Sequence, residues 1–122
     1  MINLIKNMHS YCRPSGSVTE QKFIERYIET IPNIKKDSFG NYFIRIGTDP
    51  IIFTAHTDTV HLMPGYQGLK MIGDNLMLRD QSDRGSCLGA DCGAGIFLIL
   101  KMVEAKKEGL YCFFRAEEIG GL

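Results

Sequence analysis

The sequence predicts an α/β fold, and three observations point to it. Residues 51–56 and 110–115 are short apolar runs of the kind that form buried strands. Between and before these runs lie segments with helical spacing of apolar residues, or with an apolar run long enough for a buried helix. Both strand-like runs end abruptly in polar residues, as strands do where an α/β sheet forms a site at its carboxyl edge.

The helices are predicted from their start and stop signals. Residues 3–11 have apolar residues at helical spacing. Ser17 and Glu20 then have the spacing of a capping box, so a second helix should begin there and run to about Thr30, before Pro32. A third, buried helix is expected after the small-residue segment 87–95. It should end near Gly109, with Lys106 and Lys107 in its last turn.

The remaining strands are predicted from apolar runs and turn residues. Residues 42–46 form one strand, which we expect to be an antiparallel neighbour of the strand 51–56. Residues 69–78 suggest a small hairpin around Gly73. The charged segment 79–86 is expected to be irregular and exposed. No linker or repeat divides the chain, so residues 1–122 are expected to form a single domain.

Composition excludes several classes of partner. The 14 acidic and 14 basic residues balance and no basic block occurs, which argues against nucleic acid. No apolar run reaches the roughly 20 residues that a membrane span needs. The N-terminal segment is too short and polar for a secretory signal, and the four cysteines show no CxxC spacing. We therefore expect a reducing, cytoplasmic setting and no membrane partner.

The first candidate site is His56 with Asp58, at the end of the strand 51–56. Residues two apart on a strand point to the same side, so the carboxylate can orient the imidazole. This is the usual support for a metal-binding histidine. The alternative is a structural pair in which the two side chains only satisfy each other.

Two further stretches carry acidic residues in comparable positions. Asp91 lies at the start of the third helix, where it could cap the helix or reach His56 as a metal ligand. Glu117 and Glu118 follow the strand 110–115. Because successive strand residues point to opposite sides, one could bind metal while the other accepts a proton. Solvated surface is the alternative for this pair.

Taken together, His-x-Asp, Gly-Ala-Asp before a helix and Glu-Glu after a strand resemble the co-catalytic zinc exopeptidases. This superfamily includes peptidase T, the glutamate-type carboxypeptidases, related amidases and deacylases, and tetrahedral aminopeptidases. The likeness extends to the Ser-Gly-Ser-x-Thr-Glu opening and the Asp-x-x-Gly-Asn turn. It implies a three-layer α/β/α domain with a mixed central sheet, and hydrolysis of a peptide or small amide substrate.

The resemblance also implies roles for the site residues. His56 matches a ligand of one metal ion, Asp91 the bridging ligand and Glu118 a ligand of the second ion. Asp58 matches the carboxylate that orients His56. Glu117 matches the general base, which accepts a proton from the attacking water and passes it to the leaving amine. Two zinc ions are implied, although manganese or cobalt would suit the same ligands, and the Asp91–Cys92 peptide is expected to be cis.

The sequence departs from this pattern in two places. Cys92 stands where the family commonly has Asp or Asn, and it could be a soft ligand, an oxidation-sensitive thiol or a packed side chain. Later segments of the family, which supply a further carboxylate, a final histidine and often a lid or dimerisation domain, have no counterpart here. His9 and His61 lie in no matching motif. The chain is thus expected to be the N-terminal portion of a catalytic domain, with little activity alone.

Two alternatives to an active hydrolase remain open at this stage. One is a non-catalytic or incomplete unit that acts as a metal-binding or interaction module. The other is a site completed across an oligomer. The strand 110–115 is apolar on both faces, and an exposed apolar edge there would favour a homo-oligomer.

Overall fold

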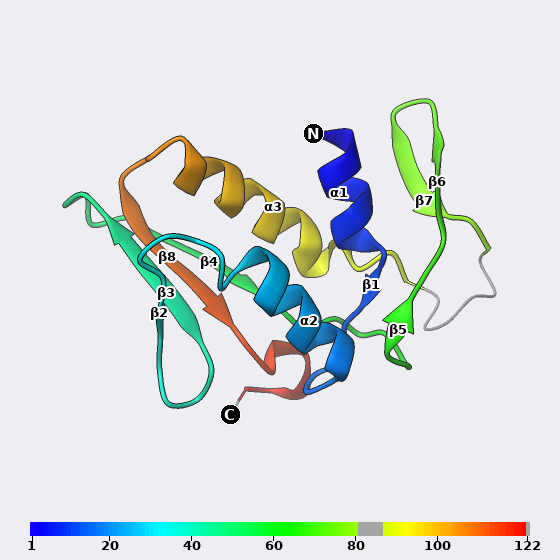
Figure 1. Cartoon of the computed structure of the whole chain (residues 1–122), viewed down its shortest axis with the longest axis horizontal. Helices are drawn as coiled ribbons and strands as arrows, with labels where there is room; N and C mark the ends of the chain where they lie inside the picture. Colours follow the sequence, from blue (N-terminus) through cyan, green and yellow to red (C-terminus); the bar gives the residue numbers. More distant parts are fainter. Residues whose placement is uncertain (81–86, 122) are drawn as a thin grey trace.

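The computed structural model describes residues 1–80 and 87–121, and its helices lie beside a four-stranded sheet and two small two-stranded sheets (Figure 1). The helices are α1 (Ile2–His9), α2 (Val18–Tyr27) and α3 (Ala90–Glu104), with a short 3-10 helix η1 (Glu117–Ile119). The main sheet contains β2 (Lys35–Lys36), β3 (Tyr42–Ile46), β4 (Ile52–His56) and β8 (Gly109–Phe114). The small sheets pair β1 (Tyr11–Cys12) with β5 (Gly65–Tyr66), and β6 (Leu69–Ile72) with β7 (Asn75–Leu78).

The main sheet is mixed, with the strand order β2-β3-β8-β4. β8 runs antiparallel to β3 and parallel to β4. The α/β class and the mixed sheet are therefore confirmed, but the prediction that 42–46 and 51–56 are neighbours is wrong. β8 lies between them, paired with β3 at one edge and with β4 at the other, and a continuous apolar run of this kind is typical of a strand in the interior of a sheet.

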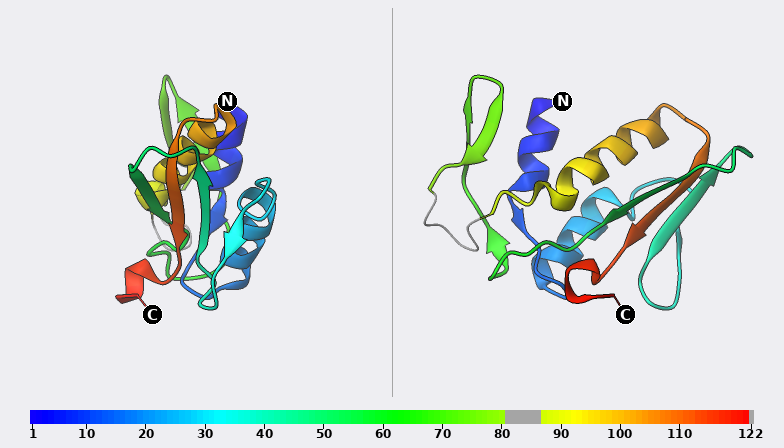
Figure 2. Two further views of the ribbon diagram at one scale, coloured as in Figure 1. Left: turned by 90° about the vertical axis from the view of Figure 1, so that its left-hand side faces the viewer. Right: turned by 180° about the vertical axis from the view of Figure 1, so that it is seen from behind.

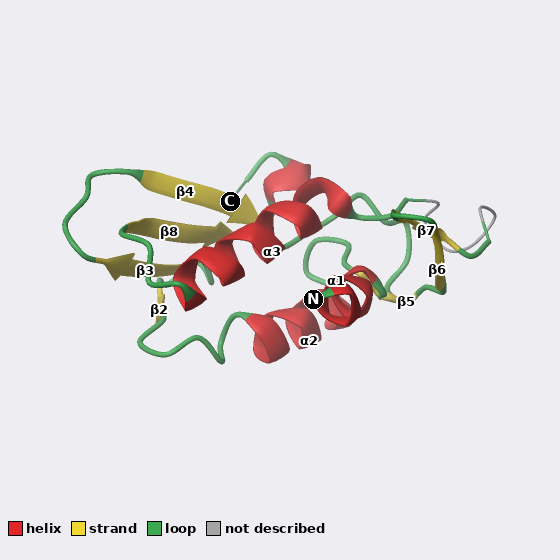
Figure 3. Ribbon diagram, turned by 90° about the horizontal axis from the view of Figure 1, so that it is seen from above, coloured by secondary structure: helices red, strands yellow, loops and turns green. Residues whose placement is uncertain are grey.

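The core lies on the face of the sheet that meets the helices. Tyr42, Ile44, Tyr111 and Phe113 pack against the buried side chains of α2 and α3. In the view from above, the three helices lie on the same side of this sheet (Figure 3). On the other face Ile52, Thr54 and Phe114 are exposed. In the part of the chain that the structure describes, the helices thus form one layer, and a second helical layer stays an expectation.

The helix ends follow local signals, with one correction. The Ser17 side chain accepts a hydrogen bond from the Glu20 amide, as the capping box predicts. α3 ends at Glu104, so its predicted end near Gly109 is wrong. Lys106 adopts the left-handed conformation (φ 56°), and the Lys107 amide donates to the Met102 carbonyl, which closes the helix in a Schellman motif without a glycine.

The 69–78 hairpin forms as predicted, with β6 and β7 pairing antiparallel around Gly73 (φ 60°). The hairpin lies at the opposite end of the molecule from β2 and β3, as the rear view shows (Figure 2). Most of the segment 79–86, expected to be irregular, lies outside the described residues. Among the residues described, no helix is long and apolar enough to cross a membrane.

Candidate metal centre

The parallel pair β4 and β8 brings two of the predicted site segments together. His56 is the Cα partner of Phe114 at the end of this pairing, and the Thr57 amide donates to the Phe114 carbonyl. Because parallel strands end at the same edge of a sheet, the residues that follow each strand emerge side by side. His56 and Asp58 therefore lie next to Glu117 and Glu118, although some 60 positions separate them in the sequence.

Glu117 and Glu118 lie in the 3-10 turn η1 and not on the strand. β8 ends at Phe114, and Ala116 turns the chain in the left-handed conformation (φ 61°). The expectation that the Glu117 and Glu118 side chains point in opposite directions assumed strand geometry, which does not apply in this turn. One carboxylate oxygen of each glutamate instead lies within 4 Å of His56 Nε2.

The Asp58 side chain fixes this turn. It is fully buried, and its two carboxylate oxygens accept hydrogen bonds from the amides of Glu117 (3.1 Å) and Glu118 (3.0 Å). The imidazole of His56 is instead held mainly by the Asp58 backbone, with Nδ1 2.8 Å from the carbonyl oxygen and 3.4 Å from the carboxylate. A carbonyl accepts only, so Nδ1 carries the proton and Nε2 faces the acidic residues.

Asp91 reaches His56 from the start of α3. Asp91 and Cys92 have non-helical backbone angles, and the peptide bond between them is cis, as the resemblance implies. Gly89 occupies the N-cap position (φ 81°), where it has no side chain to offer the helix. The Asp91 carboxylate lies 2.8 Å from His56 Nε2, and its side chain is 84% exposed. The structure thus brings Asp91 to the imidazole.

The donor set fits a divalent metal ion. From His56 Nε2, the nearest carboxylate oxygens of Asp91, Glu117 and Glu118 lie at 2.8, 3.6 and 3.9 Å. Two ligand atoms about 2.1 Å from a tetrahedral zinc ion are roughly 3.4 Å apart, within this range. The ligand atoms of His56, Asp91 and Cys92 also lie within 4.8 Å of one another. Imidazole and carboxylate ligands suit zinc, and carboxylates suit manganese.

The charges at the site affect protonation. Burial lowers the pKa of His56, but the hydrogen bond to Asp91, the Asp58 carbonyl and the charge of Glu117 outweigh it and raise the pKa overall. The pKa of Glu118 is raised by burial and by the nearby charge of Asp91. Acidic groups that repel one another around one imidazole are stabilised by a cation placed between them.

Two solved structures share this architecture. Aminoacylhistidine dipeptidase from Vibrio alginolyticus superposes with a TM-score of 0.67 at 19% identity, over 98% of this chain and 28% of that chain. Aminopeptidase PepT from Bacillus cereus ATCC 10987 superposes with a TM-score of 0.68 at 16% identity, over 98% of this chain and 36% of that chain. The chain has the fold of these two peptidases.

This likeness is one of fold. It confirms at that level the resemblance to peptidase T and its relatives that the three sequence stretches indicate. Neither a protein-family model nor a curated protein matches the sequence. The chain spans roughly a third of the length of the two peptidases, which cover 98% of it.

Residues that support the site were not predicted from the sequence. Glu20, Thr57 and Arg115 form one hydrogen-bonded group behind it, and Asn41 accepts a bond from the Arg115 amide. Two signals were available: Glu20 belongs to the capping box, and Asn41 to the Asp-x-x-Gly-Asn turn. Both motifs are explained by local structure, a helix cap and a turn, so neither indicated a contact with the end of β8.

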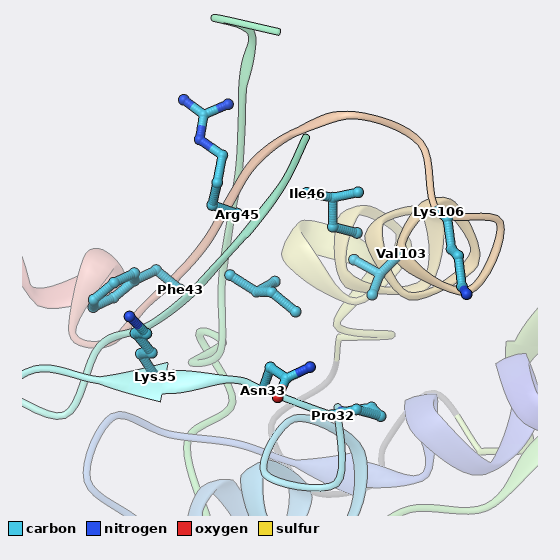
Figure 4. A pocket seen from close by; sticks show the side chains of 9 residues that line it. Pro32, Asn33, Lys35, Phe43, Arg45, Ile46, Val103 and Lys106 are labelled. Carbon is cyan, nitrogen blue, oxygen red and sulfur yellow. The ribbon is translucent and has the colours of Figure 1, made fainter. Parts of the chain in front are cut away.

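The other two histidines and a second cavity are not part of the ligand group around His56. His9 and His61 are buried, and neither belongs to the groups of potential ligands among the described residues. A cavity of about 450 Å³ lies at the far end of β3 and α3, where Ile46 and Val103 face each other and Lys35 and Lys106 lie at its rim (Figure 4). Its lining residues include no histidine, cysteine or acidic residue, so they offer none of the metal ligands found around His56.

Proposed function

We propose that the chain carries the dinuclear metal centre of a hydrolase that cleaves peptide or small amide bonds in the manner of an exopeptidase. The observation that carries the proposal is the convergence of Asp91, Glu117 and Glu118 on His56 Nε2 from two separate segments, the start of α3 and the turn η1. The peptidase fold supports it, because the two similar structures are a dipeptidase and an aminopeptidase.

The residues divide by chemistry. His56 and Asp91 would hold one ion, and Asp91 and Glu118 the other, with Cys92 as an additional potential donor beside the first. Divalent ions held by these residues would supply Lewis-acid chemistry, which polarises a scissile carbonyl and lowers the pKa of the attacking water. Glu117, which is 57% exposed beside this group, would accept the proton of the attacking water and deliver it to the leaving amine.

Space for a substrate is available next to Glu117. A cavity of about 480 Å³ lies between the turn before β3 and the end of β8, and Glu117 forms part of its wall. Its lining includes Phe39 and Phe114, which are 65% and 42% exposed. An apolar wall beside a base would hold the substrate by burial while its amide bond faces the acidic group.

A second candidate is a metal-binding module without turnover. The side chains of Asp91 and Glu117 are 84% and 57% exposed, whereas electrostatic catalysis is strongest where water is excluded. Among the described residues, each ion would have two protein ligands, fewer than the three that catalytic zinc normally has. A neighbouring copy could supply the remaining ligand, and we expect low activity from the isolated monomer.

The decisive experiment measures metal content at neutral pH after exchange into metal-free buffer, followed by an assay with dipeptide substrates. We expect wild type to retain metal and Asp91→Ala to lose it, since Asp91 is the proposed bridging ligand. Glu118→Gln should weaken retention on the order of tenfold or more, because it removes a ligand. Glu117→Gln should keep the metal but lose any measurable hydrolysis.

Glu104→Ala is the matched control, because Glu104 is an exposed acidic residue on the same helix as Asp91. It should bind metal as wild type does. Metal retained without hydrolysis would favour the metal-binding module. If wild type retained no metal, or if Asp91→Ala retained as much as wild type, the proposed centre would be refuted.

A further inference from the structure

The carboxylate of Glu20 is fully buried at the meeting point of three segments. One oxygen accepts the Gly16 amide (2.8 Å) and the guanidinium of Arg115 (3.3 Å). The other accepts the hydroxyl of Thr57 (2.8 Å). A capping box would direct this carboxylate to the Ser17 amide, so the observed contacts go beyond what the start of α2 requires.

Burial of this charge is costly unless cations and donors compensate it. Arg115 supplies one compensating charge directly. Arg13 supplies a second one nearby: it is 1% exposed, and burial lowers its pKa to about 10 while the charges of Glu20 and Asp58 act against that shift. A helix cap on the surface does not require a buried carboxylate with two nearby arginines.

Both side chains that Glu20 holds adjoin the candidate metal centre. Thr57 lies between His56 and Asp58 and is fully buried. Arg115 comes two residues before Glu117, and its own amide donates to Asn41 Oδ1 (2.9 Å). Glu20 therefore connects the segment that carries the imidazole to the segment that carries the two glutamates, through the Thr57 hydroxyl and the Arg115 guanidinium.

We propose that Glu20 is a positioning residue for the metal centre: by holding Thr57 and Arg115 together, it sets the separation between His56 and the turn that carries Glu117 and Glu118. The inference rests on the proposed function, since it assigns Glu20 a part in that same site. Partners that orient ligands affect metal affinity on the order of tenfold to a hundredfold when they are removed.

The test is a titration of the whole chain with Co²⁺, read by visible absorption, alongside urea unfolding of the metal-free protein. Glu20→Gln keeps the shape of the side chain and removes its charge. We expect it to weaken Co²⁺ binding on the order of tenfold. Thr57→Val should weaken binding similarly, whereas Thr57→Ser, which keeps the hydroxyl, should bind Co²⁺ as wild type does. The double variant Glu20→Gln/Thr57→Val should weaken binding by less than the product of the two single effects, because both substitutions act through one contact.

Two control variants separate positioning from general stability. Ile24→Val removes a buried methylene from the same helix, so it should lower the urea midpoint of unfolding without changing a residue of the network. Glu25→Gln removes an exposed charge one residue further along. Both should bind Co²⁺ as wild type does.

The outcomes distinguish the two proposals. If wild type binds Co²⁺ but Glu20→Gln and Thr57→Val bind it as Ile24→Val does, positioning by Glu20 is refuted and the metal centre stands. If wild type does not bind Co²⁺, the metal centre itself is refuted, and the positioning role with it. Weaker binding by Glu20→Gln at a stability equal to that of Ile24→Val supports the inference.

Discussion

The three histidines of the chain have three different environments. His56 faces acidic groups, which raise its pKa. Burial lowers the pKa of His9, whose Nδ1 contacts the Ile5 carbonyl (2.8 Å) while Nε2 has no hydrogen-bond partner among the described residues. Burial also lowers the pKa of His61, which contacts Thr59 and the Cys87 carbonyl. Folding therefore favours the neutral forms of His9 and His61.

These shifts predict a pH dependence of stability. A histidine whose pKa is lowered by folding stabilises the native state fully above its ordinary pKa of about 6.5, and this contribution is lost as the pH falls below that value. His56 acts with the opposite sign, since its contribution is lost as the pH rises through its raised pKa. In metal-free buffer, the unfolding free energy of His9→Gln should therefore fall less between pH 7 and pH 5 than that of wild type.

Urea unfolding at several pH values would measure this difference. Carboxylates titrate in both proteins, so their contribution cancels in the comparison. Parallel curves for wild type and His9→Gln would show that His9 is not held neutral by the fold.

The residues of the candidate centre were predictable because each stands at the end of an apolar run or at a helix start. The supporting contacts were not. Glu20 and Arg115 are 95 positions apart and meet only because β8 inserts beside β3. The hydrogen-bond partner of His56 Nδ1 could not be predicted either. The sequence pattern is the same whether the partner is the backbone carbonyl of Asp58 or its carboxylate.

At the scale of elements, local sequence signals predicted which helices and strands exist better than they predicted the arrangement of these elements or the residues at which they end. Caps, turns and apolar periodicity are properties of neighbouring residues, and they gave α2, the β6–β7 hairpin and the strand β8. The order of the strands depends on contacts between distant segments, so β8 between β3 and β4 could not be read from the short loop that joins those two strands. The end of α3 depends on a left-handed Lys106, which is unusual for a lysine.

The N-terminal cap of α2 gives a prediction at this scale. The Ser17 side chain accepts the Glu20 amide hydrogen bond (3.2 Å), so Ser17→Ala should leave that amide without its capping partner. We expect a loss of about 1 kcal/mol in the free energy of unfolding. Urea unfolding would measure it, with the exposed Ser38→Ala as the control, and equal stabilities of the two variants would contradict the role of the cap.

At the scale of the whole molecule, the sheet has an open edge in a different place from the one expected. β8 is central, so an apolar edge at residues 110–115 does not exist in the described structure. Among the described strands, β4 instead pairs with β8 alone, and it carries Ile52, which is 59% exposed, after Ile51, which is 44% exposed. Unpaired strand edges with apolar side chains favour pairing with another chain.

We therefore predict that the purified chain self-associates through β4 at high concentration. Ile52→Lys should reduce this association, because a charged residue on an edge strand opposes pairing. Leu62→Lys, at a position 83% exposed away from the sheet, should not. Sedimentation over a range of concentrations would measure both, and a monomeric wild type would contradict the prediction.

The anchoring of the η1 turn by Asp58 has a consequence for how this site can change over evolution. Asp58 holds the backbone amides of Glu117 and Glu118, and those amides are present whatever side chains the two positions carry. Substitution at either position thus alters the reactive groups while the turn keeps its shape. Single substitutions at positions 117 and 118 could therefore remove or replace the reactive groups at this edge of the sheet during evolution, with little loss of folding stability.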